Sequence, residues 1–278
     1  PLQGPDNMPT DQYGLFRSDI GHIGGIKSVS KDYIAHTTDD VCALVDAASD
    51  AFNGEVDCKV HFDKGHYVEV IPTNTERKSI FGTDDNIFPR IMVRAGLNAE
   101  SFIGSMAWWR DACDNLAEVT TLANTRISIR HTSGLRNNMD VLIAQFGTLK
   151  LGWENMVAAA RQMESRRVRM TDFLDQIYGR PSNEQLDLAA TGQRVRAVTN
   201  HQNRTEAIWA RLEDERVLTG RNVQSDGTVS AWEAYNAVQG YVQWDSPARE
   251  GFTSRFARVL KSARSPEVKQ AEKLALAV

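Results

Sequence analysis

Residues 127–139 read ISIRHTSGLRNNM and separate a strand-rich part of the chain from a helix-rich part. At its start, the branched residues Ile127 and Ile129 alternate with polar residues, which predicts a short strand. The hydroxyl residues Thr132 and Ser133 follow, and either one would cap a helix that begins at once. The stretch is therefore predicted to be a strand-to-helix junction.

Before this junction, the pattern predicts one helix followed by a group of strands. Thr38 is expected to cap an amphipathic helix over 38–52. Strands that alternate around the turn residues Lys64-Gly65 predict a β-hairpin. The expected strands are 58–63, 66–71, 90–97, 101–109 and 125–131, with a polar loop over 73–88 and a more helical run over 110–123.

After the junction, helical spacing dominates. The expected helices are 134–167, 171–179, 182–216 with a break near Thr191-Gly192, an amphipathic helix over 228–244, and two that start at Pro247 and Pro266. Strands that are grouped before helices, rather than alternating with them, favour an α+β fold over a doubly wound sheet.

We expect four regions that together form one composite domain. They are a disordered arm or vector remnant over 1–14, a sheet region over 15–133, long helices over 134–218 and C-terminal helices over 228–278. The 278 residues are 41% hydrophobic and 24% charged, which is typical of a globular protein with a core. No apolar run is long enough to span a bilayer, so no membrane partner is expected.

The three cysteines, Cys42, Cys58 and Cys113, form no CxxC pair. An odd number of unpaired cysteines indicates free thiols in a reducing compartment, and hence a cytoplasmic protein. No phosphate-binding loop and no G-x-S-x-G elbow is present, so no cofactor is expected.

The net charge of −4 hides an asymmetry along the chain. Residues 1–125 contain 10 Lys and Arg against 19 Asp and Glu, whereas residues 126–278 contain 22 against 17, and 18 of those 22 are arginine. Arginine pairs bidentately with phosphate and stacks on bases, so the second part could bind an anionic polymer. A solvated helical surface with many charge pairs would have the same composition.

The arginines at the junction are expected to share one face. In a strand, Arg126, Ser128 and Arg130 point to one side, while the isoleucines and His131 point to the other. The N-terminus of the next helix would add free N–H groups to an anion site. A second basic strip, 161–169, would either bind phosphate or stabilise a helix C-terminus. The predicted nucleic-acid-binding residues are Arg126, Arg130, Thr132, Ser133, Arg136, Lys64, Arg161, Arg166, Arg167 and Arg169.

The residues with catalytic or metal-binding chemistry have simpler interpretations. A pair of hairpin histidines, two adjacent aspartates in a polar loop and a cysteine in an apolar stretch are more typical of surface, loop and core positions. We therefore expect no metal and no catalytic group. The candidates for a nucleic-acid enzyme would be His61, Asp84, Asp85, Cys113 and His131.

Three short motifs resemble those of a family carried by phages and plasmids, described as a domain of unknown function (number nine-three-two). They are Cys113-Asp114-Asn115, Arg130-His131-Thr132, and the set Asn236, Ala237, Val238, Tyr241 and Val242. The resemblance covers roughly residues 15–265. Gly240 and Trp244 depart from it, because an acidic residue and a histidine are expected there.

The element order also resembles that of single-strand annealing recombinases of the RecT, Red-beta and Rad types. That resemblance implies an oligomeric ring or filament that anneals single-stranded DNA without ATP in the host cytoplasm during homologous recombination of a phage or mobile element. It also implies a phage exonuclease or a host single-strand binding protein as partner. The alternatives are an oligomeric phage protein that binds a host protein, and an uncharacterised nucleic-acid enzyme.

Overall fold

The computed structural model describes most of the chain. The described residues are 8, 10–14, 16–17, 21–22, 28–62, 65–73, 77–80, 84–96, 101–118, 122, 125–221, 226–246, 259, 262 and 265–277. Only the backbone is described for 16, 17, 21, 22, 65, 66, 136, 137, 142, 146, 147 and 150. In the described residues, no helix combines the length and the apolar character that a bilayer crossing requires.

The chain divides into two compact units, and each is assembled from three segments. Unit 1 contains Pro1–Glu76, Pro89–Ala107 and Val119–Asn155. Unit 2 contains Arg77–Phe88, Trp108–Glu118 and Met156–Val278.

Unit 1 begins with two small antiparallel pairs. Strand β1 (Gln12–Tyr13) pairs with β4 (Val29–Ser30), and β2 (Phe16–Arg17) pairs with β3 (Gly21–His22). The predicted arm over 1–14 therefore contains a strand at its end, while residues 1–7 lie outside the described part. Helix α1 (Thr38–Ala51) follows, and its buried face packs against the sheet.

Helix α1 confirms the predicted helix but not its cap. The cap is Thr37, one residue earlier than predicted: its side chain accepts from the backbone N–H of Asp40 at 3.2 Å. The Asp40 carboxylate in turn accepts from the backbone N–H of Thr37 at 2.7 Å. The reciprocal pair is a capping box, and it places Thr38 inside the helix.

Replacing Thr37 by alanine is expected to lower the free energy of unfolding by about 1 kcal/mol, because the N–H of Asp40 loses its acceptor. Thr38→Ala is the matched control and should change it by less than about 0.5 kcal/mol. Urea unfolding of both variants measures the difference, and a larger loss in Thr38→Ala would contradict the observed cap.

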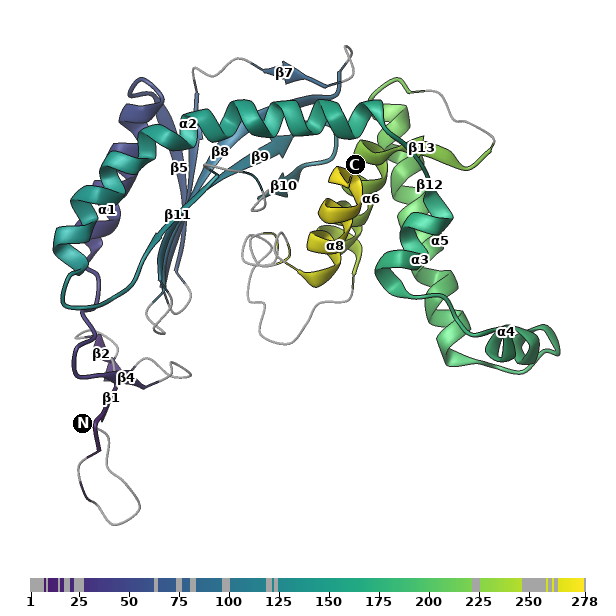
Figure 1. Cartoon of the computed structure of the whole chain (residues 1–278), viewed down its shortest axis with the longest axis horizontal. Coiled ribbons are helices and arrows are strands. Elements are labelled where there is room, and N and C mark those ends of the chain that lie inside the picture. The colour runs from purple at the N-terminus through teal and green to yellow at the C-terminus, as the bar shows by residue number, and fades with distance from the viewer. Residues whose placement is uncertain are drawn as a thin grey trace. The chain divides into compact units, whose positions relative to one another are not determined.

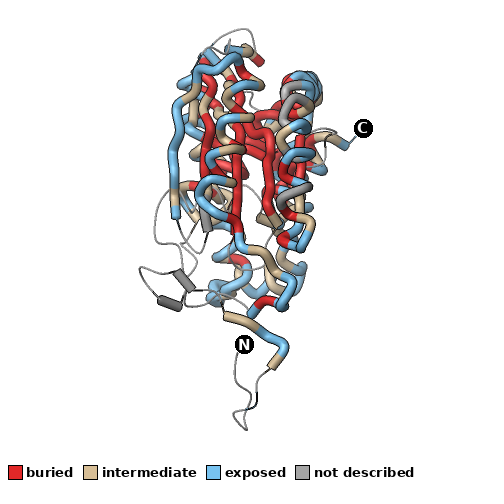
Figure 2. The backbone as a smooth tube through the Cα atoms, turned by 90° about the vertical axis from the view of Figure 1, so that its left-hand side faces the viewer, coloured by how far each residue is buried: buried red, intermediate tan, exposed pale blue. Residues whose placement is uncertain are grey.

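The largest sheet has seven antiparallel strands (Figure 1). The order is β10-β9-β8-β6-β5, with β11 also paired to β9 and β7 to β8. The strands are β5 (Val56–Phe62), β6 (Gly65–Pro72), β7 (Lys78–Ser79), β8 (Asn86–Gly96), β9 (Phe102–Arg110), β10 (Asn115–Ala117) and β11 (Arg126–Ile129). The predicted hairpin and the next two strands are therefore confirmed. Figure 2 shows that buried residues run along the strands.

The helices after the junction follow the predicted order. They are α2 (Leu135–Ser165), α3 (Met170–Tyr178), α4 (Asn183–Ala190), α5 (Arg196–Leu218), α6 (Ala231–Gly240), the π-helix η1 (Tyr241–Asp245) and α8 (Pro266–Leu276). The predicted break near Thr191-Gly192 separates α4 from α5. Pro266 begins α8 as predicted, whereas Pro247 lies outside the described residues. Grouped strands followed by helices confirm the α+β class.

Three local predictions were wrong. In the range 110–123, which was predicted to be more helical, the described residues 110–118 are not helical, because Asn115–Ala117 form β10 against Trp108–Arg110. The polar loop over 73–88 contains β7 and the start of β8, which pair with each other. Residues 228–230 form strand β13, paired with β12 (Arg167–Arg169), and all ten residues of α6 are buried. Helix α6 is therefore a central helix of unit 2 rather than an amphipathic surface helix.

Candidate functional site

The β11 strand of unit 1 has the predicted alternation. Arg126, Ser128 and Arg130 are exposed, while Ile127 and His131 are buried and Ile129 is half-buried. Two exposed arginines therefore lie four residues apart, one at the start of β11 and the other directly after its end. Exposed arginines at this spacing can donate to successive anionic groups.

His131 is a core residue that holds the junction in place. Its Nδ1 lies 2.9 Å from the backbone oxygen of Ile34, and its ring stacks against Tyr33 and Phe102 at centroid distances of 5.0 and 5.6 Å. Burial lowers the pKa of His131, so the ring is neutral near pH 7. His131 therefore points to the core side of the strand, together with Ile127, as the alternation predicts.

The cap of helix α2 lies after Thr132 and Ser133, the two residues that were predicted to cap it. The backbone oxygen of Gly134 accepts from the N–H of Asn138 at 2.9 Å, which makes Gly134 the cap position rather than Thr132 or Ser133. The Thr132 carbonyl instead accepts from the N–H of Leu135 at 2.8 Å. Both hydroxyl residues remain exposed beside the arginine face. Lys64 and the side chain of Arg136 lie outside the described part of the chain.

The second predicted basic strip has a different geometry from the expected one. Arg161 is exposed on α2, whereas Arg167 and Arg169 are exposed on strand β12 of unit 2. Arg166 is half-buried, and its Nη1 donates to the backbone oxygens of Leu274 and Ala275 at 2.6 and 3.3 Å. Arg166 therefore caps the end of α8, which is a structural role.

Arg166 and Arg169 also line a small cavity of about 310 Å³. The Gln176 amide adds a polar group and Asp172 adds a carboxylate, while Phe173 supplies an apolar wall. The structure thus brings two of the predicted arginines together, beside an acidic side chain that would weaken anion binding.

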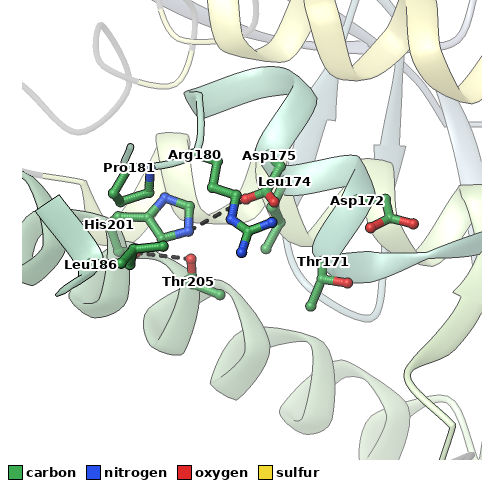
Figure 3. A pocket seen from close by; sticks show the side chains of 9 residues that line it. All are labelled: Thr171, Asp172, Leu174, Asp175, Arg180, Pro181, Leu186, His201 and Thr205. Atoms are coloured by element: carbon green, nitrogen blue, oxygen red, sulfur yellow. Dashed lines mark hydrogen bonds and ion pairs between the residues drawn. The ribbon is translucent and has the colours of Figure 1, made fainter. Parts of the chain in front are cut away.

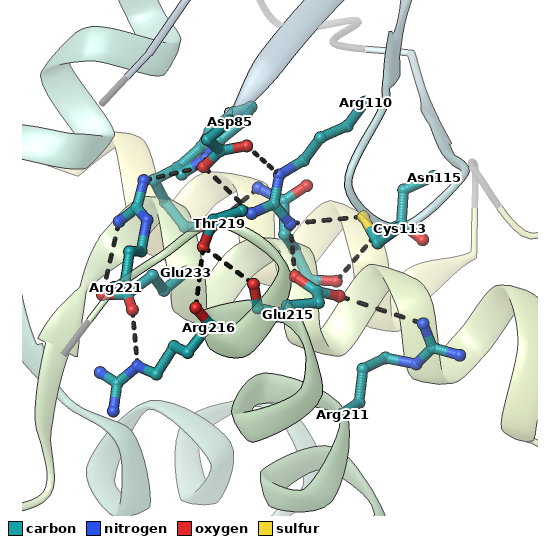
Figure 4. A network of polar contacts seen from close by, with 12 residues as sticks. Asp85, Arg110, Cys113, Asn115, Arg211, Glu215, Arg216, Thr219, Arg221 and Glu233 are labelled. Carbon is teal, nitrogen blue, oxygen red and sulfur yellow. Dashed lines mark hydrogen bonds and ion pairs between the residues drawn. The ribbon is translucent and has the colours of Figure 1, made fainter. Parts of the chain in front are cut away.

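A buried ion-pair network forms the interior of unit 2 (Figure 4). The Asp85 carboxylate accepts from Nε and Nη2 of Arg110 at 2.6 and 3.1 Å, and from Nη2 of Arg221 at 2.8 Å. The indole N–H of Trp232 donates to it at 3.0 Å. Burial disfavours ionisation of Asp85, but these cations and hydrogen bonds outweigh it and lower its pKa.

Carboxylates balance the arginines of this network. Arg110 also pairs with Glu215, and Arg221 donates to both oxygens of Glu164 at 3.0 and 2.8 Å. Arg216 donates to Glu233 at 2.7 Å. Burial raises the pKa of Glu215 despite the attraction of Arg110. A network with this balance of charge is suited to holding segments together rather than to binding an external anion.

Cys113 contacts this network through its sulfur, which accepts from Nη1 of Arg110 at 3.3 Å. Burial, assisted by Glu215, raises the pKa of the Cys113 thiol to about 12. The thiol is therefore protonated near pH 7, unlike the thiolate of a catalytic cysteine. Cys113 itself is half-buried in a turn, and its neighbours are the charged side chains of Arg110 and Glu215 rather than the apolar surroundings that were expected.

The remaining candidate catalytic residues do not share one site. Asp85 lies in the predicted loop, directly before β8, but its side chain is buried in the network, whereas Asp84 beside it is exposed. His61 is half-buried on β5 of unit 1, opposite Tyr67 on β6. Among the described residues, no three His, Cys, Asp or Glu side chains are placed to hold one metal ion.

Two of the family-like motifs meet inside unit 2. The Asn115 amide donates to the backbone oxygen of Asn236 at 3.0 Å. The Gln243 side chain pairs with the main chain of Leu116, accepting from its N–H at 3.1 Å and donating to its oxygen at 2.5 Å. Gln239 donates to the same oxygen at 2.7 Å. Strand β10 is thus held by amide side chains of α6 and η1 as well as by β9.

The two departures from the family pattern both have local partners. A Cβ atom at Gly240 would lie 2.5 Å from Cδ of Arg211, so a larger residue there would require the Arg211 side chain to move. The Arg211 guanidinium continues to Asp245, with Nε donating at 2.7 Å. Trp244 donates its indole N–H to Oδ1 of Asn115 at 3.1 Å. In this chain the C-terminal motif is therefore held by Arg211, Asp245 and the indole of Trp244.

A pocket that the sequence did not indicate lies between α3, α4 and α5 (Figure 3). Its volume is about 360 Å³, which suits a small ligand. Asp175 faces His201 at 3.4 Å, and Arg180 brings a positive charge to the same space. The hydroxyl of Thr205 donates to the His201 backbone oxygen at 2.9 Å. Asp175 lies on α3 and Arg180 follows that helix, whereas His201 and Thr205 lie on α5, so the pocket combines residues that are distant in sequence.

The comparisons with known proteins support the family resemblance that these motifs indicated. No curated protein and no solved structure matches the chain. One family model matches residues 26–273, which is most of the chain, and it includes all three motifs. The chain therefore belongs to the family described as Domain of unknown function (DUF932).

Proposed function

We propose that this protein binds single-stranded DNA and anneals complementary strands without ATP, as an oligomer in the cytoplasm of a phage-infected or plasmid-bearing cell. The observation that carries the proposal is the exposure of Arg126 and Ser128 on one face of β11 and of Arg130 directly after the strand. His131 and Ile127 fix the opposite face of the strand in the core, so the two guanidinium groups are held on a rigid element.

Several features support nucleic acid as the ligand. Arginine forks match phosphate oxygens, and their planes stack on unpaired bases. The hydroxyls of Thr132 and Ser133 are exposed beside them and add hydrogen-bonding groups for a phosphate or sugar. Arg161, Arg167 and Arg169 give unit 2 exposed cations of its own. A phage exonuclease or a host single-strand binding protein would be a partner of this activity.

Replacing Arg126 and Arg130 together by alanine is expected to weaken the binding of an oligothymidine about tenfold. The logarithm of affinity should also fall less steeply with the logarithm of salt concentration, with a slope smaller by about 1.4, because each single-strand phosphate contact contributes about 0.7. Fluorescence anisotropy between about 50 and 200 mM salt measures both quantities.

The matched control replaces two exposed arginines before and at the start of α5, Arg194→Ala with Arg196→Ala. It removes the same charge but leaves β11 intact, so its slope should remain close to that of the unmodified protein. If both double variants change the slope equally, β11 is not the binding face. An affinity that is independent of salt would contradict phosphate binding altogether.

Exposed apolar residues favour a second candidate, an oligomeric protein that binds a host protein. Val141 and Leu151 on α2 are 53% and 61% exposed, and Val217 at the end of α5 is 81% exposed. Size-exclusion chromatography with and without the oligonucleotide separates the candidates. Assembly that is identical in both runs, with no oligonucleotide in the protein peak, would favour the second.

A further inference from the structure

Strand β5 of unit 1 is the last strand of the sheet (Figure 1). It pairs with β6 along its whole length, and within the described residues no strand pairs with its other edge. Five of its seven residues are exposed and the other two are half-buried. The edge of a sheet is a template for another strand, and here it is accessible.

One face of β5 is apolar. Val56, Cys58, Val60 and Phe62 alternate along the strand and therefore project to the same side. Val60 is 65% exposed and Phe62 is 37% exposed, whereas Val68, which lies opposite Val60 on β6, is buried. Helix α1 packs against β6. The apolar surface of the sheet therefore extends past the buried residues of β6 onto the exposed strand β5.

The opposite face of β5 carries charges of both signs. Asp57 and Lys59 are both exposed, and they flank Cys58. In an antiparallel pair of identical strands that is centred on Cys58, each Asp57 lies opposite Lys59 of the other copy. Pairs centred on Asp57 or on Lys59 would instead place like charges opposite each other, which destabilises a sheet.

We propose that two copies of this chain pair through β5, antiparallel and two-fold, with Cys58 facing Cys58 of the second copy. This register joins Val56 of one copy to Val60 of the other, so the apolar faces also continue across the pair. Lys59 lies 3.8 Å from Glu69, and that carboxylate also accepts from Nε of Arg90 at 3.1 Å. Glu69 therefore still has Arg90 as its ion-pair partner when Lys59 turns toward the second copy.

The pairing deepens the proposed function, because it rests on that function's oligomeric part, and it leaves the β11 arginine face accessible. Strands β6, β8 and β9 lie between β5 and β11. Four strand spacings separate the two strands by about 19 Å. Each dimer would thus present two arginine faces, one from each copy.

The first test is disulfide formation in a Cys42→Ser variant treated with diamide, which takes up the two protons and two electrons that the thiols lose. Opposite residues of an antiparallel pair have Cα atoms about 4.5–5.5 Å apart, within the range a disulfide requires. Burial and the neighbouring carboxylates of Asp57 and Asp46 raise the pKa of the Cys58 thiol, so the reaction is run at alkaline pH. We expect a covalent dimer that disappears when Cys58→Ser is added.

The second test reverses the charges and uses sedimentation equilibrium. Asp57→Lys alone, or Lys59→Asp alone, makes both cross-strand pairs repulsive and should weaken the dimer about tenfold, whereas both changes together should restore it. A monomer at every concentration would overturn the proposal, as would single and double variants that dimerise equally. Neither test contains DNA, so a protein that does not bind DNA could still dimerise in them. Likewise, a protein that does not dimerise through β5 could still bind DNA.

Discussion

Replacing Arg110 by methionine is expected to lower the free energy of unfolding by about 3–5 kcal/mol, the usual effect of removing one partner from a buried ion pair. The guanidinium is buried and serves three acceptors: Asp85, Glu215 and the sulfur of Cys113. Asp85 would retain Arg221 and Trp232, but Glu215 would lose its principal cation. Urea unfolding monitored by circular dichroism measures the loss.

The matched control is Arg77→Met, which removes an exposed arginine of the same unit. Arg77 lies 3.9 Å from Asp111, and both side chains are more than half exposed. Such a pair contributes at most about 1 kcal/mol because water screens it. Equal losses in the two variants would show that the buried network does not stabilise unit 2. Adding Glu215→Gln to the Arg110 variant should recover part of the loss, because it removes the unpaired charge.

Replacing Gln243 by methionine is expected to lower the free energy of unfolding by about 1–3 kcal/mol. Methionine has a similar volume, but it leaves the buried backbone N–H of Leu116 without its acceptor. The Leu116 oxygen would still accept from Gln239, so the missing N–H partner accounts for most of the effect. Urea unfolding gives the free energy, and hydrogen exchange of the Leu116 amide should become faster.

Gln202→Met is the control for this substitution, since Gln202 is exposed on α5. It should change the free energy of unfolding by less than about 0.5 kcal/mol. If Gln243→Met is as mild as this control, the amide bridge does not hold β10 in place.

The parts of the fold that the sequence predicted correctly depend on neighbouring residues. The alternation in β11 is encoded within about one strand, and the position of α2 is encoded to within one residue of its start. The same holds for the β5–β6 hairpin, whose turn and alternating strands are adjacent in sequence. The candidate DNA-binding face could therefore be predicted, and the structure places Arg126 and Arg130 on it as expected.

The parts that sequence reasoning missed depend on distant residues. Residues 110–123 have helical spacing, but Leu116 is held by Gln243, 127 positions further along the chain. The burial of the loop residue Asp85 was missed because its partner Arg221 is 136 positions away. Helix α6 was predicted to be amphipathic, since no local signal showed that other elements of unit 2 bury it on every side.

The division of each unit into three segments has a consequence during synthesis on the ribosome. Asp85 and Arg110 emerge early, but Glu215 follows Arg110 by 105 residues. At a translation rate of about 5–20 residues per second, the arginine waits about 5–20 s for this partner. Unit 1 is complete once Asn155 has emerged, whereas unit 2 requires the last helices. A nascent chain halted after α2 would therefore expose the side chains of the future network to water, and to the chaperones that bind unfinished proteins.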